Sequence, residues 1–261
     1  MNEKVFTWND YKTFVAAIIQ QSNSIFCRGQ ADSAWKLRTS FHRVADTITL
    51  PQYLDKILPE VQYNICAVYD DLTDLKSENE FASFLALVQH YGFPTPMLDW
   101  TFSPYIAAYF AYREVNDTVP QSENVKVYLF LYDAWLEEFP QPPFNLRETI
   151  EFIGVLRPFA KYNPRIIPQQ SGFTVTNVDD MEAYINNKKE GFLHSVLLPV
   201  KEKPMVMKEL NLMGINEITM FPSIGGICRE LKTRFFSPNS LDSRRMKLDM
   251  IRKRTPKEKP I

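Results

Sequence analysis

The residues best suited to chemistry lie in one short segment, residues 89–101, which reads QHYGFPTPMLDWT. Its polar side chains include His90, Asp99 and Thr101, and its glycine and prolines interrupt any regular helix or strand. An irregular segment that leads directly into an apolar helix is a common place for binding residues. His90 could act as an acid or base, contact a ribose, or hold a loop carbonyl. Asp99 could pair with a cation or cap a turn.

A second candidate is Arg28, which stands in the otherwise apolar stretch IFCRG. A guanidinium there needs an anion or a carboxylate, because a buried unpaired charge is very costly. Its planar fork suits a phosphate, and Gly29 would let a ligand approach closely. The alternative is a structural ion pair with Asp99. Nearby, Tyr91 and Trp100 could enclose a nicotinamide or adenine ring, or could simply pack in the core.

The composition argues against several classes of protein. The chain has 261 residues, 45% of them apolar, enough for a sizeable core in one large domain or one domain with an appendage. A net charge of −1 gives no general reason to expect nucleic acid or an anionic membrane as partner. No apolar run approaches the roughly 20 residues of a membrane span, and the start lacks the core of a signal peptide. Three scattered cysteines and three scattered histidines indicate a cytoplasmic protein without a disulfide framework or a metal site.

Hydrophobic periodicity supplies the elements that must position the candidate residues. It predicts helices at 9–21, 53–69, 78–91, 104–114, 179–187, 206–213 and 224–235. It predicts strands near 24–28, 125–132, 171–176 and 192–198, and a last strand or strand-like turn at 215–222. Helices come mostly first and strands mostly later, which indicates an α+β domain with a small central sheet flanked by helices. The helix at 104–114 should be buried, with Ser103 as its N-cap and Pro104 in its first turn.

The motifs resemble those of the FRG domain family, which is named for a Phe-Arg-Gly motif. Here that motif reads Phe26-Cys27-Arg28-Gly29-Gln30, and the family's strongest block stands at 89–101. The resemblance continues through 165–174 and 214–222, so it covers roughly residues 10–235. We therefore expect an FRG domain at 1–240 and a basic, flexible tail at 241–261, which is either solvated or in contact with nucleic acid or a partner. The chain departs from the family at Pro96, where the family usually has Arg, and at 223–226, where the family has an acidic turn.

At a second remove, the layout is similar to that of ADP-ribosyltransferases. The resemblance implies an ADP-ribosyltransferase-like fold and NAD as substrate, in a transferase or NAD glycohydrolase acting as a bacterial or phage-derived toxin or phage-defence effector. The catalytic residues that it implies are Arg28, His90, Asp99, Thr101 and Glu217. The residues that it implies for NAD binding are Arg28, Gln30, Tyr91, Trp100, Gln169 and Gln170.

A different class of function stays open, because Gln169 and Gln170 stand where a transferase generally needs a carboxylate. Glu217, expected beside a strand, is the alternative acid. The competing hypothesis is a non-catalytic module that binds a nucleotide-like ligand or a protein. Under either hypothesis we expect a small nucleotide ligand, no membrane, and an unidentified macromolecular acceptor if there is one. Arg28, His90, Asp99 and Thr101 should converge on one cleft, with Gln169, Gln170 or Glu217 at its far wall.

Overall fold

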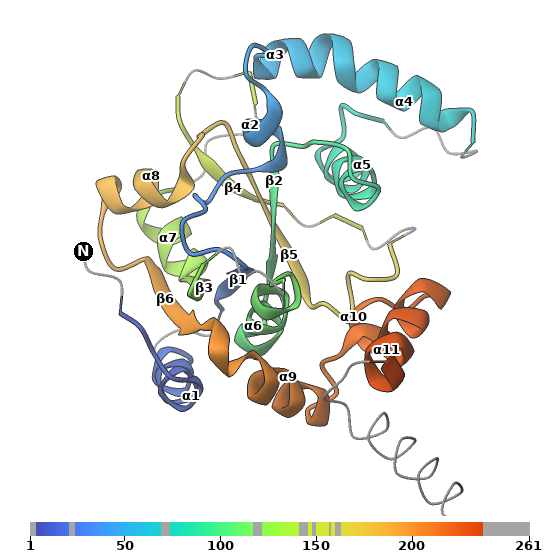
Figure 1. Ribbon diagram of the computed structural model, residues 1–261. Coiled ribbons are helices and arrows are strands. Elements are labelled where there is room, and N and C mark those ends of the chain that lie inside the picture. Colours follow the sequence, from blue (N-terminus) through green and yellow to red (C-terminus); the bar gives the residue numbers. More distant parts are fainter. Residues whose placement is uncertain are drawn as a thin grey trace, which may run out of the picture.

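The protein is built around a six-stranded sheet with helices on both of its faces (Figure 1). The computed structural model describes residues 4–20, 24–68, 74–116, 122–140, 146–147, 150–156, 158–159 and 163–236. The strands are β1 (Phe26–Gln30), β2 (Met97–Thr101), β3 (Asn124–Phe130), β4 (Ile153–Leu156), β5 (Ser171–Thr176) and β6 (Leu193–Pro199). Their order across the sheet is β4-β5-β2-β1-β3-β6, and all neighbouring strands are antiparallel.

Helices fill most of the connections between the strands. They are α1 (Trp8–Ile18), α2 (Ser40–Val44), α3 (Leu50–Gln52), α4 (Leu58–Cys66), α5 (Glu78–His90), α6 (Pro104–Arg113), α7 (Tyr132–Glu138), α8 (Met181–Lys188), α9 (Lys203–Leu212), α10 (Glu217–Met220) and α11 (Ile224–Phe236). A π-helical segment, Tyr53–Ile57, joins α3 to α4, and a 3-10 turn, Val200–Glu202, precedes α9. The predicted α+β domain with a central sheet is therefore confirmed.

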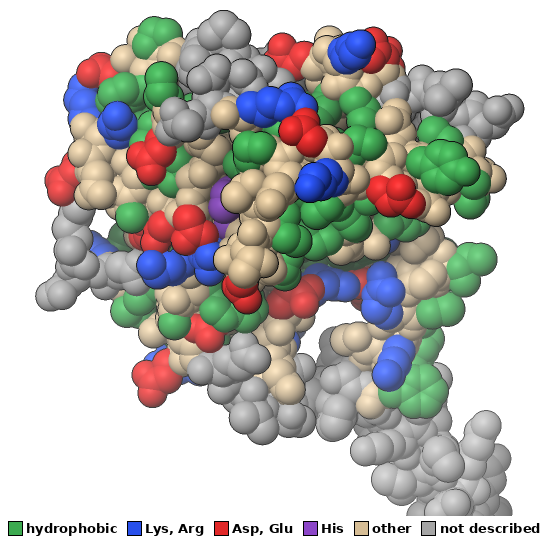
Figure 2. Space-filling model, turned by 90° about the horizontal axis from the view of Figure 1, so that it is seen from above, with side chains coloured by type: hydrophobic (Ala, Val, Ile, Leu, Met, Phe, Trp, Pro, Cys, Tyr) green, Lys and Arg blue, Asp and Glu red, His purple; other side chains and the backbone are tan. Residues whose placement is uncertain are grey.

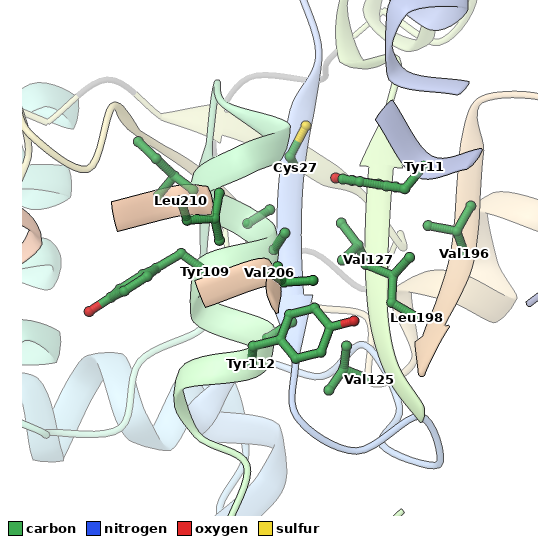
Figure 3. Close-up of a cluster of buried hydrophobic side chains, with 14 of the residues drawn as sticks. Tyr11, Cys27, Tyr109, Tyr112, Val125, Val127, Val196, Leu198, Val206 and Leu210 are labelled. Carbon is green, nitrogen blue, oxygen red and sulfur yellow. The ribbon is translucent and has the colours of Figure 1, made fainter. Parts of the chain in front are cut away.

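Apolar side chains on both faces of the sheet pack against the helices and form the core. On one face, α1, α6 and α9 pack on β1, β3 and β6, and Figure 3 shows Val206 and Leu210 of α9 beside Tyr109 and Tyr112 of α6. On the other face, α7 and α8 cover Trp100 and neighbouring aromatic rings. A third cluster packs α5 against β2, β4 and β5. Helix α6 is buried as predicted, and the Ser103 hydroxyl accepts a hydrogen bond from the Ile106 N–H at 3.3 Å.

Several segments differ from the sequence-based expectation. The region 89–101 is not wholly irregular, because α5 continues to His90 and Met97–Thr101 forms strand β2. Strand β2 is hard to recognise because it is buried on both faces and carries a charged residue at its centre. Residues 217–220 form one turn of helix rather than a strand, because the Asn216 side chain accepts hydrogen bonds from the Ile218 and Thr219 N–H groups. Strand β4 was not predicted, and the predicted tail at 241–261 lies outside the described residues.

The sheet opens between β1 and β2. Strand β1 pairs with β3 along its whole length, and β2 pairs with β5 along its whole length. In contrast, β1 and β2 pair only at Cys27 and Thr101. The two central strands therefore leave a gap beyond that pair, and Asp99 of β2 faces it from one side while Arg28 of β1 faces it from the other. This opening places the candidate site.

Candidate functional site

A cavity of about 350 Å³ lies at the opening between β1 and β2. Its walls come from these two strands, from α5 and α6, and from the segment 163–171 that leads into β5. Phe221, directly after α10, closes one side. The sequence-predicted residues that line the cavity are Arg28, Gln30, His90, Asp99, Trp100, Thr101 and Gln169. The cleft thus brings together residues that lie far apart in the sequence.

Arg28 contacts Asp99, but through the backbone rather than as a side-chain ion pair. Its guanidinium donates a hydrogen bond of 2.6 Å to the carbonyl oxygen of Asp99. Its Nε is buried and has no hydrogen-bond partner among the described residues. Burial lowers the pKa of Arg28, while the negative charge of Asp99 opposes that shift. Arg28 is therefore a desolvated cation with donor capacity left over for an anion.

The requirement for glycine at position 29 comes from helix packing. A Cβ on Gly29 would lie 2.0 Å from the carbonyl oxygen of Ala107 and 2.6 Å from the amide nitrogen of Ala111. Gly29 therefore allows β1 to lie directly against α6. The space that a Cβ at Gly29 would occupy is taken by α6, so the absence of a side chain there serves helix packing and not, as expected, the approach of a ligand.

The Asp99 carboxylate is oriented by a chain of hydrogen bonds. Gln89 of α5 donates through Nε2 to Oδ1 of Asp99 at 2.5 Å. The Thr95 hydroxyl donates to Oε1 of Gln89, which leaves the amide nitrogen of Gln89 facing Asp99. The side chain of Asp99 is accessible to water, but the cavity walls surround it. Desolvation by these walls raises the pKa of Asp99, and the charge of Arg28 and the hydrogen bond from Gln89 oppose this shift. Asp99 is a fixed carboxylate facing an arginine-lined cavity.

Two further arginines line the cavity, Arg43 in α2 and Arg165 before β5. Among the described residues, neither guanidinium forms a salt bridge. His90, at the end of α5, lies near both Arg165 and Asp99. Burial and the charge of Arg165 lower the pKa of His90, and Asp99 opposes them. The imidazole is therefore neutral near pH 7.

The aromatic candidates are placed differently from the expectation. Trp100 touches the cavity, but it is 3% exposed and its indole donates to the Thr174 hydroxyl at 2.8 Å. Tyr91 is 68% exposed and is not part of the cavity wall. Trp35 is 46% exposed and does line the cavity, as does Phe221. Trp35 is thus the tryptophan available to stack on a bound ring.

The polar candidates Thr101, Gln169 and Gln30 have partners in the fold. Thr101 donates to the carbonyl of Gln169 at 2.8 Å and accepts from the Ser103 N–H. The Gln169 amide donates to the carbonyl of Met220 at 2.8 Å. Gln30 donates to a backbone carbonyl, while its Oε1 is buried without a partner among the described residues. Gln170 has a positive φ of 47° at an exposed turn and lies outside the cavity lining.

Glu217 is held in a separate cluster and does not line the cavity. Its carboxylate accepts hydrogen bonds from Arg113 at 2.8 and 3.0 Å, from Arg229 at 2.5 Å and from the Tyr109 hydroxyl at 2.7 Å. Burial alone would raise the pKa of Glu217, but these donors outweigh it and lower the pKa to about 2. Each carboxylate oxygen already has two donors. Glu217 therefore ties α10 to α6 and α11, and it is not available to a substrate.

Taken together, the cavity combines three arginines with one oriented carboxylate. Its other acid, Glu114, is paired with Arg113. Over the face in Figure 2, described basic and acidic side chains are intermixed, as expected for a chain with a net charge of −1. The arrangement of charges in the cavity can bind an anion and place a carboxylate beside it.

Sequence reasoning missed several lining residues, notably Trp35, Arg43, Gln89 and Arg165. Gln89 and Arg165 stand inside the motifs that carry the family resemblance, and this is the signal that could have found them, whereas Trp35 and Arg43 follow the Phe26–Gln30 motif at a distance. Among the described residues no cluster of His, Cys, Asp and Glu could hold a metal ion. None of the described helices is long and apolar enough to cross a membrane.

Comparison with known families bears on the N-terminal half of the chain. Residues 22–119 match the FRG domain family. The chain contains an FRG domain. The matched range holds β1, β2, α5 and α6, and with them Arg28, Arg43, Gln89, His90 and Asp99. It ends before Arg165 and Glu217. No curated protein and no solved structure matches the chain.

Proposed function

We propose that the FRG domain binds a nucleotide in the arginine-lined cavity, and that NAD is the ligand. The single observation that carries this proposal is the guanidinium of Arg28, whose Nε has no hydrogen-bond partner among the described residues, beside the fixed carboxylate of Asp99. NAD carries an anionic pyrophosphate and a cationic nicotinamide ring. Arg28 and Arg43 match the first of these groups, and Asp99 matches the second. Charge complementarity of both signs favours NAD over a simple polyanion.

The remaining parts of NAD also find suitable partners. Trp35 offers an exposed indole for stacking on the adenine or nicotinamide ring. Neutral His90, and the Oε1 of Gln30, which has no partner in the part of the chain that the structure describes, can hydrogen-bond ribose hydroxyls. These roles replace those assigned to Tyr91 and Gln170 from the sequence.

A second candidate function is cleavage of the bound NAD, and it is favoured by the position of Asp99. In such a step the bond between the ribose C1′ and the nicotinamide nitrogen breaks, and its electron pair leaves with neutral nicotinamide. The Asp99 carboxylate would stabilise the resulting oxocarbenium ion. Water, or an acceptor nucleophile, would then bond to C1′ and give up a proton to Asp99. The raised pKa of Asp99 makes it a better proton acceptor than an ordinary aspartate.

The alternative, a non-catalytic binding module, is favoured by the state of Glu217. The second acid expected from the sequence is fully engaged by arginines and a tyrosine. An NAD-cleaving enzyme here would have to work with Asp99 as the carboxylate at the ribose. If it does, the protein fits a toxin-type or phage-defence effector that depletes NAD or modifies a macromolecular acceptor in the cytosol.

The test uses the full chain and separates binding from cleavage. Binding of ADP-ribose, which lacks nicotinamide and cannot be cleaved in this way, is measured by titration calorimetry. Arg28→Gln should weaken it at least about tenfold, since charge-assisted hydrogen bonds are lost. The control Arg147→Gln removes an exposed arginine that pairs with Asp55 and should leave binding unchanged. Absence of ADP-ribose and NAD binding by the wild type contradicts the proposal.

Cleavage is followed as release of nicotinamide from NAD, with and without cell extract as a source of acceptors. Asp99→Asn should abolish release while NAD still binds, because the amide keeps the size of the side chain and loses its charge. No release by the wild type, together with binding that depends on Arg28, would leave the non-catalytic module as the function.

A further inference from the structure

The part of the cavity wall formed by the segment before β5 carries a second cationic group that the proposed function does not use. Arg165 lies in the segment before β5, and its guanidinium stands over the ring of Phe221 at 4.9 Å from the centroid. Arg113 and Arg229 approach the same ring at 4.4 and 5.5 Å. Three guanidinium groups therefore surround one phenylalanine side chain at the edge of the cavity.

The three arginines differ in their partners. Arg113 and Arg229 both donate to the carboxylate of Glu217. Among the described residues, the Arg165 guanidinium has neither a carboxylate nor a carbonyl as acceptor, and it faces the cavity lining. Burial and the nearby charges of Arg229 and Arg113 lower the pKa of Arg165. A positively charged surrounding of this kind favours an anion beside Arg165.

Arg165 is not part of the Arg28 group. Arg28 and Arg43 lie close to Asp99, from the side of β1 and α2. Arg165 lies close to His90, from the side of β5 and α10. His90 is itself near Asp99, so these two neighbouring side chains lie near different cationic groups, His90 near Arg165 and Asp99 near Arg28 and Arg43. A ligand that satisfies both cationic groups needs anionic groups at two separate places.

We infer that the cavity selects a nucleotide with a second, separate phosphate group, such as the 2′-phosphate of NADP, and that Arg165 binds this phosphate. The inference rests on the proposed function, because it assumes a nucleotide at Arg28. Phe221 holds the guanidinium of Arg165 in place by stacking, which leaves its donors free for the phosphate oxygens. Arg113 and Arg229 stay with Glu217 and add only their long-range charge.

The experiment compares ADP-ribose with ADP-ribose 2′-phosphate, two probes that lack nicotinamide, by titration calorimetry at fixed ionic strength. Wild type should bind the 2′-phosphorylated probe at least about tenfold more tightly. Arg165→Gln should reduce this preference to less than about threefold while leaving ADP-ribose affinity nearly unchanged. Arg165→Lys keeps the charge and should keep part of the preference. Arg147→Gln serves as the matched control and should keep all of it.

The outcomes separate the inference from the proposed function. Equal affinity of the wild type for the two probes, or a preference that survives Arg165→Gln, overturns the inference and leaves nucleotide binding intact. Binding of neither probe overturns the proposed function and the inference with it. Urea unfolding of each variant accompanies the titrations. If Arg165→Gln is not folded, Arg165→Lys decides, because an undiminished preference in a variant that cannot form the forked contact contradicts the role of Arg165.

Discussion

Replacement of Glu217 by Gln should destabilise the protein by about 3 kcal/mol at pH 7. The side chain of Glu217 is only 11% exposed and is shared by Arg113, Arg229 and Tyr109. Removing one partner of a buried ion pair costs roughly 3–5 kcal/mol. The lower end of this range applies here, because half of the Arg229 side chain is exposed and water can solvate its charge when the carboxylate is removed.

The pKa of Glu217 leads to the same magnitude. It is about 2 in the folded protein, against an ordinary value of 4.5. Each tenfold change in proton affinity corresponds to about 1.4 kcal/mol, so the ionised carboxylate contributes about 3 kcal/mol. Because the folded pKa is the lower one, this contribution is complete above about pH 4.5 and is lost as the pH falls toward 2. At pH 3 roughly half of it should remain.

Urea unfolding of the wild type and of Glu217→Gln at pH 7 and pH 3 measures both effects. Glu138→Gln is the control, since the Glu138–Lys189 pair is about half exposed and should contribute less than about 1 kcal/mol. Wild-type stability of Glu217→Gln at pH 7 would refute the view that Glu217 is a structural anchor. A loss that is the same at pH 7 and pH 3 would refute the assignment of its cause to the ionised carboxylate.

Three further predictions concern the cavity and its support. Gly29→Ala should destabilise the protein by about 3 kcal/mol or more in urea unfolding, because the added Cβ would lie 2.0 Å from the backbone of α6. The control is Gly225→Ala, where the atom nearest to the added Cβ is 3.5 Å away, and it should change stability by less than about 1 kcal/mol. Gln89→Leu should raise the pKa of Asp99 further, measured by carboxyl ¹³C NMR, because the hydrogen bond that favours its ionised form is lost; an unchanged pKa would show that Gln89 does not support Asp99. Acrylamide should quench mainly Trp35, the only one of the four tryptophans more than 3% exposed, and ADP-ribose should protect it; protection that persists in Trp35→Phe would place the ligand elsewhere.

Much of the fold could be predicted from periodicity because most elements have one buried face. Helix α6 and strands β3, β5 and β6 follow directly from apolar patterns and capping signals. Strand β2 could not be predicted in this way, since its pattern depends on burial on both faces and on a charged residue at the opening of the sheet. The helical turn α10 depends on one Asn216 cap, which outweighs the β-branched residues within it.

The site was predictable for residues that stand in unusual sequence contexts, and not for residues whose role depends on tertiary contacts. Arg28, His90 and Asp99 meet in one cavity, as their unusual sequence contexts indicated. Glu217 had an equally suitable residue type, but its fate depends on Arg113 and Arg229, which come from other helices. Tyr91 and Trp35 differ in the same way, because only the packing of the chain decides which ring borders the cavity.

The central claim is that Arg28 binds the phosphate of a nucleotide in the opening between β1 and β2. A crystal structure of the protein with ADP-ribose tests it most directly. The account predicts phosphate oxygens within about 3 Å of the Arg28 guanidinium, and the terminal ribose, which carries nicotinamide in NAD, on the side of Asp99. A nucleotide bound outside this cavity, or one whose phosphates point away from Arg28, would contradict it.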